Sequence, residues 1–179
     1  MFRILLSMLV VLAATSVSGC ARIHELMTKT PSATAAVLPT RDSTVRGNIR
    51  LVQRDGGQVL VTGSISGLAP GPHGFHIHEK GNCSAPDAVS AGGHFNPGGT
   101  PHGAVDGAPR HGGDLGNIVA GPDGVARVDV LVSGISLGTA ADSVVGRSVI
   151  VHAKADDFAT QPSGNAGSRM ACGLISRSE

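Results

Sequence analysis

Histidine gives the first chemical signal in this sequence, since the chain of 179 residues has 8 His although only 15% of its residues are charged. Imidazoles in such number indicate metal or proton chemistry. His76 and His78 lie two residues apart in the segment 74–79, a predicted β-strand, so both side chains leave the same face of that strand. Such a pair is a good start to a metal site but is weak evidence by itself.

A second group of candidate ligands lies in a segment that cannot order itself. Residues 80–113 include 9 Gly and 4 Pro but only three large apolar side chains, and fixing each backbone residue costs about 1–2 kcal/mol. In or directly after this segment lie three imidazoles and a carboxylate, a set that suits tetrahedral Zn²⁺. These residues are His94, His102, His111 and Asp114. Metal binding is therefore expected to order the loop.

The remaining histidines have different expected roles. His152 ends the predicted strand 144–152 and is a sixth candidate ligand. His73 is out of step with the pair in the first strand, so we expect it to form structural hydrogen bonds. His24 has no candidate partner nearby and is expected to be solvated. Scattered polar histidines would be the alternative, but they would not explain why six of the eight lie at strand ends or in a loop that needs a ligand.

The elements that must position these groups are predicted to be β-strands. From residue 44 onward, short apolar runs alternate with turn residues, and no stretch of 11 residues has helical periodicity. Turns at Asp55-Gly56-Gly57 and Gly121-Pro122-Asp123-Gly124 are typical of hairpins. The expected strands are 45–52, 59–65, 74–79, 118–119, 125–132, 144–152 and 171–175. About seven or eight antiparallel strands at this spacing predict an all-β sandwich or barrel.

The N-terminus predicts export. Arg3 precedes an apolar run of 11 residues, which is too short to span a bilayer as a helix, so residues 1–19 are interpreted as a signal peptide of the lipoprotein type. The small residues before Cys20 resemble a bacterial lipobox, in which the cysteine is acylated and becomes the first residue of the mature chain. An ordinary signal peptide that happens to contain a cysteine is the alternative.

A domain boundary is expected near residue 42. Residues 20–41 are rich in Ala, Thr, Ser and Pro and are expected to form a lipidated N-terminus and flexible linker, followed by one domain at 42–179. The chain has 14 Lys and Arg against 13 Asp and Glu, without basic runs or interleaved aromatic residues. This balance excludes nucleic-acid binding as a function class.

Four segments resemble the signature sequences of the Cu/Zn superoxide dismutase family. They are Gly74-Phe75-His76-Ile77-His78-Glu79, Ser90-Ala91-Gly92-Gly93-His94-Phe95-Asn96-Pro97, His111-Gly112-Gly113-Asp114-Leu115-Gly116-Asn117 and Gly164-Asn165-Ala166-Gly167-Ser168-Arg169-Met170-Ala171-Cys172-Gly173. The match runs in unbroken order from about residue 42 to residue 176. The resemblance implies an eight-stranded antiparallel Greek-key β-barrel with long metal-binding and active-site loops. The position of Cys83 is more similar to bacterial periplasmic members than to eukaryotic cytosolic ones.

The resemblance also implies two adjacent metal sites with copper and zinc as cofactors. The implied copper ligands are His76, His78, His94 and His152. The implied zinc ligands are His94, His102, His111 and Asp114. His94 would therefore bridge the two ions, with one ring nitrogen on each.

Two further roles come from matching positions in the family. Asp156 matches a carboxylate that hydrogen-bonds His76 and His102 and so orients one ligand of each metal. Arg169 matches the guanidinium beside copper that attracts and positions an anionic substrate, for which lysine would be a poorer substitute. Arg169 and His94 are thus the expected catalytic residues.

Cys83 and Cys172 match the two positions that the family joins in a disulfide, which agrees with export to an oxidising compartment. The segment 158–163 carries no charged residue, unlike the loop that steers substrate in eukaryotic members. The candidates to replace its charges are Lys80, Arg110 and Lys154. Bacterial members of the family include monomers and dimers, so the resemblance allows either a monomer or a homodimer.

The implied activity is dismutation of superoxide, the substrate, to dioxygen and hydrogen peroxide by alternate reduction and oxidation of copper. A protein that buffers or delivers copper and zinc in the periplasm without catalysis is the alternative, although it would not need Arg169. The expected location is the bacterial cell envelope, facing the periplasm and attached to a membrane through the lipid on Cys20.

Overall fold

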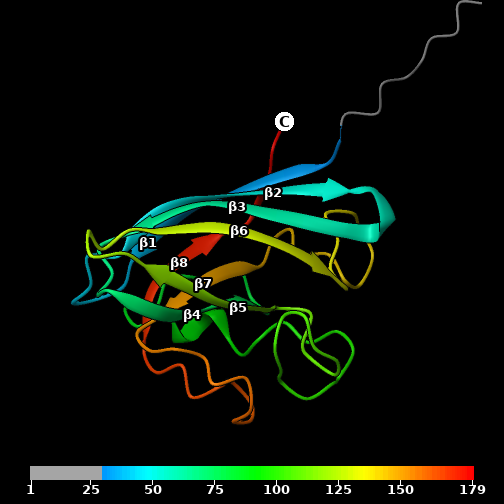
Figure 1. The fold of residues 1–179 in the computed structure, drawn as a ribbon. Coiled ribbons are helices and arrows are strands. Elements are labelled where there is room, and N and C mark those ends of the chain that lie inside the picture. Colours follow the sequence, from blue (N-terminus) through cyan, green and yellow to red (C-terminus); the bar gives the residue numbers. More distant parts are fainter. Residues whose placement is uncertain (1–29) are drawn as a thin grey trace, which may run out of the picture.

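The β-sheet of this chain closes on itself. The computed structural model describes residues 30–179 (Figure 1), so the signal peptide, Cys20 and His24 of the sequence-based predictions lie outside the described residues. Within the described range, no helix has the length and apolarity needed to cross a membrane.

The described residues form nine strands, connected with two short 3₁₀ turns at Asp55–Gly57 and Val89–Ala91. The strands are β1 (Ser32–Pro39), β2 (Arg46–Arg54), β3 (Gln58–Ser66), β4 (Gly71–His78), β5 (Asp114–Ala120), β6 (Ala126–Ser133), β7 (Ser148–His152), β8 (Arg169–Leu174) and β9 (Ser176–Arg177). Neighbours follow the order β2-β3-β6-β5-β4-β7-β8-β1, and β1 pairs again with β2. The predicted eight-stranded antiparallel Greek-key barrel is therefore confirmed, with β9 as a short addition along β1.

Aliphatic side chains fill the barrel. Along β2 and β3 the alternate residues Ile49, Leu51, Val59 and Val61 are buried, while their neighbours face outward. This alternation is what a strand with one buried face requires. Because the chain has no Trp or Tyr, Val, Ile, Leu and Ala supply most of the packed interior.

The flexible linker predicted for residues 20–41 is wrong over Ser32–Pro39, which forms β1. This strand closes the barrel by pairing with β2 over six residues and with β8 at Leu38 and Pro39. Its inward side chains are Ala33, Ala35 and Val37, all at most 2% exposed. Small alanines at two of three inward positions give little hydrophobic contrast with the outward residues, so the alternation was not visible in the sequence.

Strand β4 is covered on both sides. Phe75 and Ile77 lie in the core, whereas His76 and His78 on the other face are also buried, because loops cover them. These loops are 79–113 and 153–168, and Figure 1 shows both on the side of the barrel formed by β4, β5 and β7. The barrel thus supplies a rigid wall and the two loops supply its cover.

Candidate metal centre

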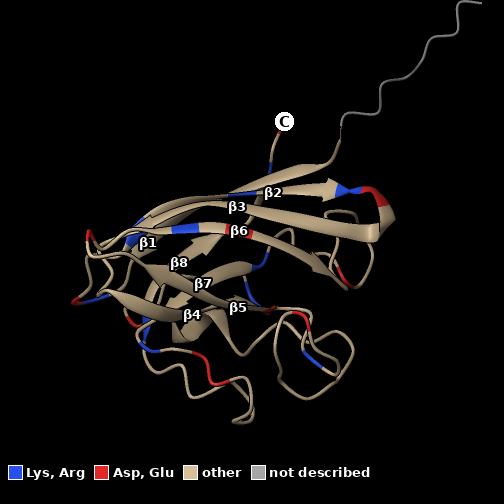
Figure 2. Ribbon diagram, viewed as in Figure 1, with Lys and Arg blue, Asp and Glu red and all other residues tan. Residues whose placement is uncertain are grey.

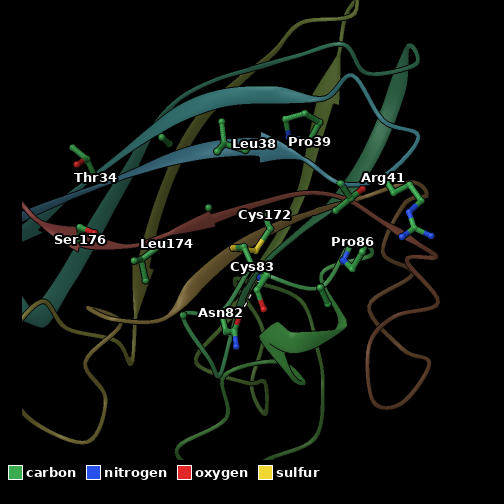
Figure 3. A pocket seen from close by; sticks show the side chains of 16 residues that line it. Thr34, Leu38, Pro39, Arg41, Asn82, Cys83, Pro86, Cys172, Leu174 and Ser176 are labelled. Atoms are coloured by element: carbon green, nitrogen blue, oxygen red, sulfur yellow. Dashed lines mark hydrogen bonds between the residues drawn. A yellow bond between two sulfur atoms is a disulfide. The ribbon is translucent and has the colours of Figure 1, made fainter.

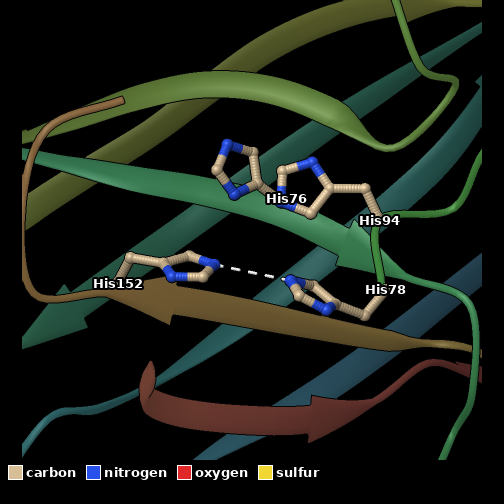
Figure 4. Close-up of side chains that lie close together, drawn as sticks. All are labelled: His76, His78, His94 and His152. Carbon is tan, nitrogen blue, oxygen red and sulfur yellow. Dashed lines mark hydrogen bonds between the residues drawn. The ribbon is translucent and has the colours of Figure 1, made fainter. Parts of the chain in front are cut away.

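Four histidines converge on the outer face of β4. His76 and His78 come from β4, His152 ends the adjacent strand β7, and His94 comes from loop 79–113, held beside His78 by an isolated β-bridge. Figure 4 shows the four rings directed toward a common point. We call these residues the four-histidine group; each offers a ring nitrogen, and these atoms all lie within 4.8 Å of one another.

Hydrogen bonds select which nitrogen of each ring is free. Nδ1 of His78 donates to the carbonyl of Gly92 at 2.9 Å, and Nδ1 of His152 donates to that of Gly167 at 3.2 Å. Their Nε2 atoms face each other at 3.4 Å, too close for two N–H groups. Nδ1 of His76 and Nε2 of His94 are buried without a hydrogen-bond partner. Buried polar atoms are seldom left unpaired, so these lone pairs fit a bound metal ion.

The second cluster, the aspartate group, consists of His94, His102, His111 and Asp114. The Nδ1 atoms of the three histidines lie 2.9, 3.0 and 3.2 Å from Oδ1 of Asp114. Zinc bonds of about 2.0–2.1 Å in a tetrahedron place ligand atoms about 3.3 Å apart. The residues present therefore fit Zn²⁺. His94 belongs to both groups, with Nδ1 in this one and Nε2 in the other.

Asp156 links the two groups from behind. Its Oδ2 lies 2.8 Å from Nε2 of His76, and its Oδ1 lies 2.9 Å from Nε2 of His102. The residue is 3% exposed and is held by Asn117, whose side chain accepts from the backbone N–H of Asp156 at 2.8 Å and donates to its carbonyl at 2.9 Å. Asp156 thus orients one ring of each group, as expected from its position.

A glycine makes this link possible. Gly164 has a φ of +64°, and a Cβ there would overlap the Asp156 carboxylate and come within 2.7 Å of Nε2 of His102. The sequence alone assigned no role to Gly164 or Asn117, although both lie in segments that resemble the family signatures. The sequence shows which residue types are present in those segments, but it does not show in which direction each side chain points.

Burial favours the neutral form of three of these histidines, His76, His78 and His152. It lowers the pKa of His76 and of His78 well below the usual 6.5, and neighbouring imidazoles add to the effect on both. Burial also lowers the pKa of His152, to about 4. Neutral imidazoles are the form that binds a metal ion.

In the aspartate group, burial and hydrogen bonding act in opposite directions. Burial would raise the pKa of Asp114, but hydrogen bonds from His94 and from the backbone N–H groups of Gly103 and His111 hold it well below its usual range. Burial would lower the pKa of His102, but the carboxylates of Asp156 and Asp114 outweigh it and raise that pKa. Asp114 is therefore ionised, the state that a metal ligand needs.

Arg169 lies at the mouth of the four-histidine group. Its Nη1 and Nη2 donate to the carbonyls of Ala88 and Gly92, each at 2.6 Å, and leave the half-buried guanidinium beside a hollow of about 380 Å³. His78, His94 and His152 also line this hollow. A small anion entering it would meet a fixed positive charge in the same hollow as the rings of His78, His94 and His152.

The predicted disulfide is confirmed. Cys83 is joined to Cys172, which lies 89 residues further along the chain, and the bond ties loop 79–113 to β8. Figure 3 shows it in the wall of a second hollow, of about 1000 Å³, between β1, β8 and the start of that loop. The disulfide thus fixes the loop whose carbonyls hold Arg169.

The other predicted residues lie outside the two groups. Arg110 donates to the carbonyls of His111 and Ser133, while Lys80 and Lys154 are exposed. Lys154 lies beside Gly167, which lines the hollow at Arg169. His73 has its ring nitrogens 2.9 Å from the carbonyls of His152 and Ala69, in agreement with the structural role predicted for it.

A Greek-key barrel that carries a four-histidine group and an aspartate group joined through one imidazole has ligand sets that could hold two adjacent metal ions. The sequence model of copper/zinc superoxide dismutases matches residues 45–175. This chain belongs to the copper/zinc superoxide dismutase family.

Comparison with solved structures gives the same fold. The crystal structure of the clock protein EA4 is similar to this chain with a TM-score of 0.75 and 41% sequence identity, over 86% of this chain and 99% of that one. The similarity therefore extends over essentially the whole of that chain.

Proposed function

We propose that this protein catalyses the dismutation of superoxide, converting two superoxide anions and two protons to dioxygen and hydrogen peroxide. One observation carries the proposal, namely that Arg169 faces the same hollow as His78, His94 and His152. A protein that only stores metal gains nothing from a fixed cation at the open side of the site, whereas an enzyme with an anionic substrate does.

The two groups divide the work between two metals. The four-histidine group would hold copper, which supplies one-electron reduction and oxidation, and the aspartate group would hold zinc, which is redox-inert. Imidazole suits copper in both oxidation states, so His76, His78 and His152 would keep hold of the ion while Nε2 of His94 takes up and gives back a proton.

The side chains of this protein would position the substrate, supply a proton and orient the metal ligands. Arg169 attracts superoxide and orients it at the open side of the four-histidine group. Nε2 of His94 is buried and has no hydrogen-bond partner, so it can hold a proton close to the substrate and give it up as the peroxide forms. Asp156 keeps the rings of His76 and His102 at a fixed angle.

The same proposal includes the cellular location. We propose a bacterial lipoprotein that is attached through acylated Cys20 and faces the periplasm. The disulfide Cys83–Cys172 supports an oxidising compartment, and the residues around Cys20 resemble a lipobox. Mass spectrometry of the mature N-terminus tests this location, and an unmodified start at any other residue would contradict it.

The function is tested by loading the protein with copper and zinc and measuring inhibition of superoxide-driven cytochrome c reduction. Arg169→Ala is expected to keep both metals while its rate falls roughly 10- to 1,000-fold, and the dependence of the rate on ionic strength should weaken. Arg177→Ala is the matched control, because Arg177 also donates to backbone carbonyls but lies on β9. A fully loaded wild-type protein without activity would favour the metal-buffer alternative.

A further inference from the structure

Gln161 makes a two-point contact with a residue of the aspartate group. Its Oε1 accepts a hydrogen bond from the backbone N–H of His102 at 2.8 Å, and its Nε2 donates to the carbonyl of His102 at 3.0 Å. A single side-chain amide thus pairs with both backbone groups of one ligand. Two hydrogen bonds to the same residue restrain the orientation of its backbone as well as its distance from Gln161.

The contact joins two loops that are far apart in the sequence. His102 belongs to loop 79–113 and Gln161 to loop 153–168, the loop that also supplies Asp156 to Nε2 of His102. The ring and both backbone groups of His102 are therefore held by the same loop. A change that restrains His102 therefore also restrains loop 153–168, and a change that restrains the loop also restrains His102.

The residues after Gln161 line the hollow at Arg169. Pro162 and Ser163 line the hollow that contains Arg169 and the rings of His94 and His152. Pro162 and Ser163 are the first and second residues after Gln161, which contacts His102. A shift at Gln161 is therefore passed directly to one wall of the hollow.

Burial alone does not hold that wall. Phe158 is 40% exposed, and Gln161 and Pro162 are also exposed. Local bonds fold the segment on itself, since Asp157 accepts from the N–H groups of Ala159 and Thr160. A segment with so little apolar burial opens at low free energy unless it is tied to something rigid.

We propose that Gln161 is a positioning residue that makes the wall of the copper hollow depend on an occupied zinc site. Zinc at the aspartate group immobilises His102, and Gln161 transmits that order to Pro162 and Ser163. The importance of this contact for catalysis rests on the proposed function. The test of the contact itself uses no superoxide, so the two proposals can fail separately.

The test compares the whole chain with its Gln161→Ala variant in two measurements. The affinity for Co²⁺, a coloured substitute for Zn²⁺, is measured by competition with a chelator, and a loss of about tenfold or more is expected, as for other residues that orient metal ligands. Hydrogen exchange of residues 158–164 is measured with and without one equivalent of Zn²⁺. We expect zinc to slow this exchange at least tenfold in the wild type and clearly less in the variant, in which Asp156 alone still joins the loop to His102.

A matched control separates positioning from general stability. Gln53 makes the same kind of contact elsewhere, since its Nε2 donates to the carbonyl of Gln58 and its Oε1 accepts from the N–H of Leu137. Gln53→Ala should change neither measurement. If Gln161→Ala does not fold, Gln161→Met keeps the length of the side chain without its hydrogen bonds and should give the same two losses. Unchanged cobalt affinity and unchanged zinc-dependent protection in either folded variant would overturn the proposal.

Discussion

The carbonyl oxygen of Gly92 holds two functional side chains at once. It accepts from Nη2 of Arg169 at 2.6 Å and from Nδ1 of His78 at 2.9 Å. The first bond positions the cation at the hollow, and the second leaves Nε2 of His78 free for a metal. Gly92 has a φ of +75°, which favours glycine. The direction of one carbonyl group therefore sets how the Arg169 guanidinium lies relative to the His78 ring.

Gly164 provides a test of the link through Asp156. In Gly164→Ala the added methyl group would overlap the Asp156 carboxylate, so Asp156 must move away from both His76 and His102. We expect the affinities for copper and for zinc each to fall by about 10- to 100-fold in chelator competition.

Gly56→Ala is the control for this substitution. Gly56 also has a positive φ, +74°, but a Cβ there would have nothing within 4 Å. It therefore carries the same backbone strain at a hairpin, where there are no candidate ligands. Equal metal affinities in the two variants would contradict the role given to Asp156.

The lowered pKa of His152 predicts how the metal-free protein responds to acid. Its pKa is about 4 in the folded state and about 6.5 in the unfolded state, so between these values the unfolded chain binds the proton more readily. The free energy of unfolding should therefore be unaffected by this residue above pH 6.5. As the pH drops from 6.5 to 4, His152 alone should lower the free energy of unfolding by about 3 kcal/mol.

Urea unfolding at several pH values measures this effect. His152→Gln removes the titrating imidazole, so the slope of unfolding free energy against pH should decrease by about one proton in the same window. An unchanged slope would show that His152 is not a neutral buried imidazole in the metal-free protein.

Among the elements, β1 matters most for closing the barrel. It pairs with β2 on one side and with β8 and β9 on the other, and it covers the core with Ala33, Ala35 and Val37. Without it, β2 and β8 would both have unpaired edges and the core would be open to water.

A pair of truncations tests this role. A chain beginning at Pro31 should keep cooperative thermal unfolding, whereas a chain beginning at Thr40 should lose the β-sheet signal in circular dichroism or aggregate. The two differ only in β1 and the residue before it. A cooperative transition at the same temperature in both would show that residues 32–39 are not needed for closure.

Taken together, the barrel and its loops differ in what holds them in place. The barrel has a continuous apolar core, whereas loops 79–113 and 153–168 depend on the ligand groups, Asp156 and the disulfide. Figure 2 shows basic and acidic residues scattered over strands and loops without a continuous stripe of either. Arg169 is the residue with a full charge among those that line the hollow at the candidate metal centre.

Removing the metals should separate these two parts. After dialysis against a chelator, limited proteolysis is expected to cut within 95–112 and 153–168, while the strands stay intact and the sheet signal remains. Ligand binding to the native state alone raises stability, so adding zinc back should protect both loops. Cleavage throughout the chain in the metal-free protein would show that the barrel also needs its metals.

The sequence by itself determined the residue types of the metal centre and the class of fold. The spacing of His76 and His78 on one strand is a local property, as are the hairpin turns at Asp55 and Gly121. Strand β5 began earlier than predicted, at Asp114, because its first residues are polar and glycine-rich and lack an apolar alternation.

Only the tertiary structure decided the contacts between distant segments. Residues 32–39 could not be predicted as a strand from the sequence, because their small side chains give only a weak hydrophobic alternation. They form a strand because they pair with the edges of β2 and β8. The contact of Gln161 with His102 crosses 59 residues, and the overlap that selects glycine at 164 depends on where Asp156 lies. Periodicity reports which face of a strand is buried, but it carries no information on which loops meet above that face.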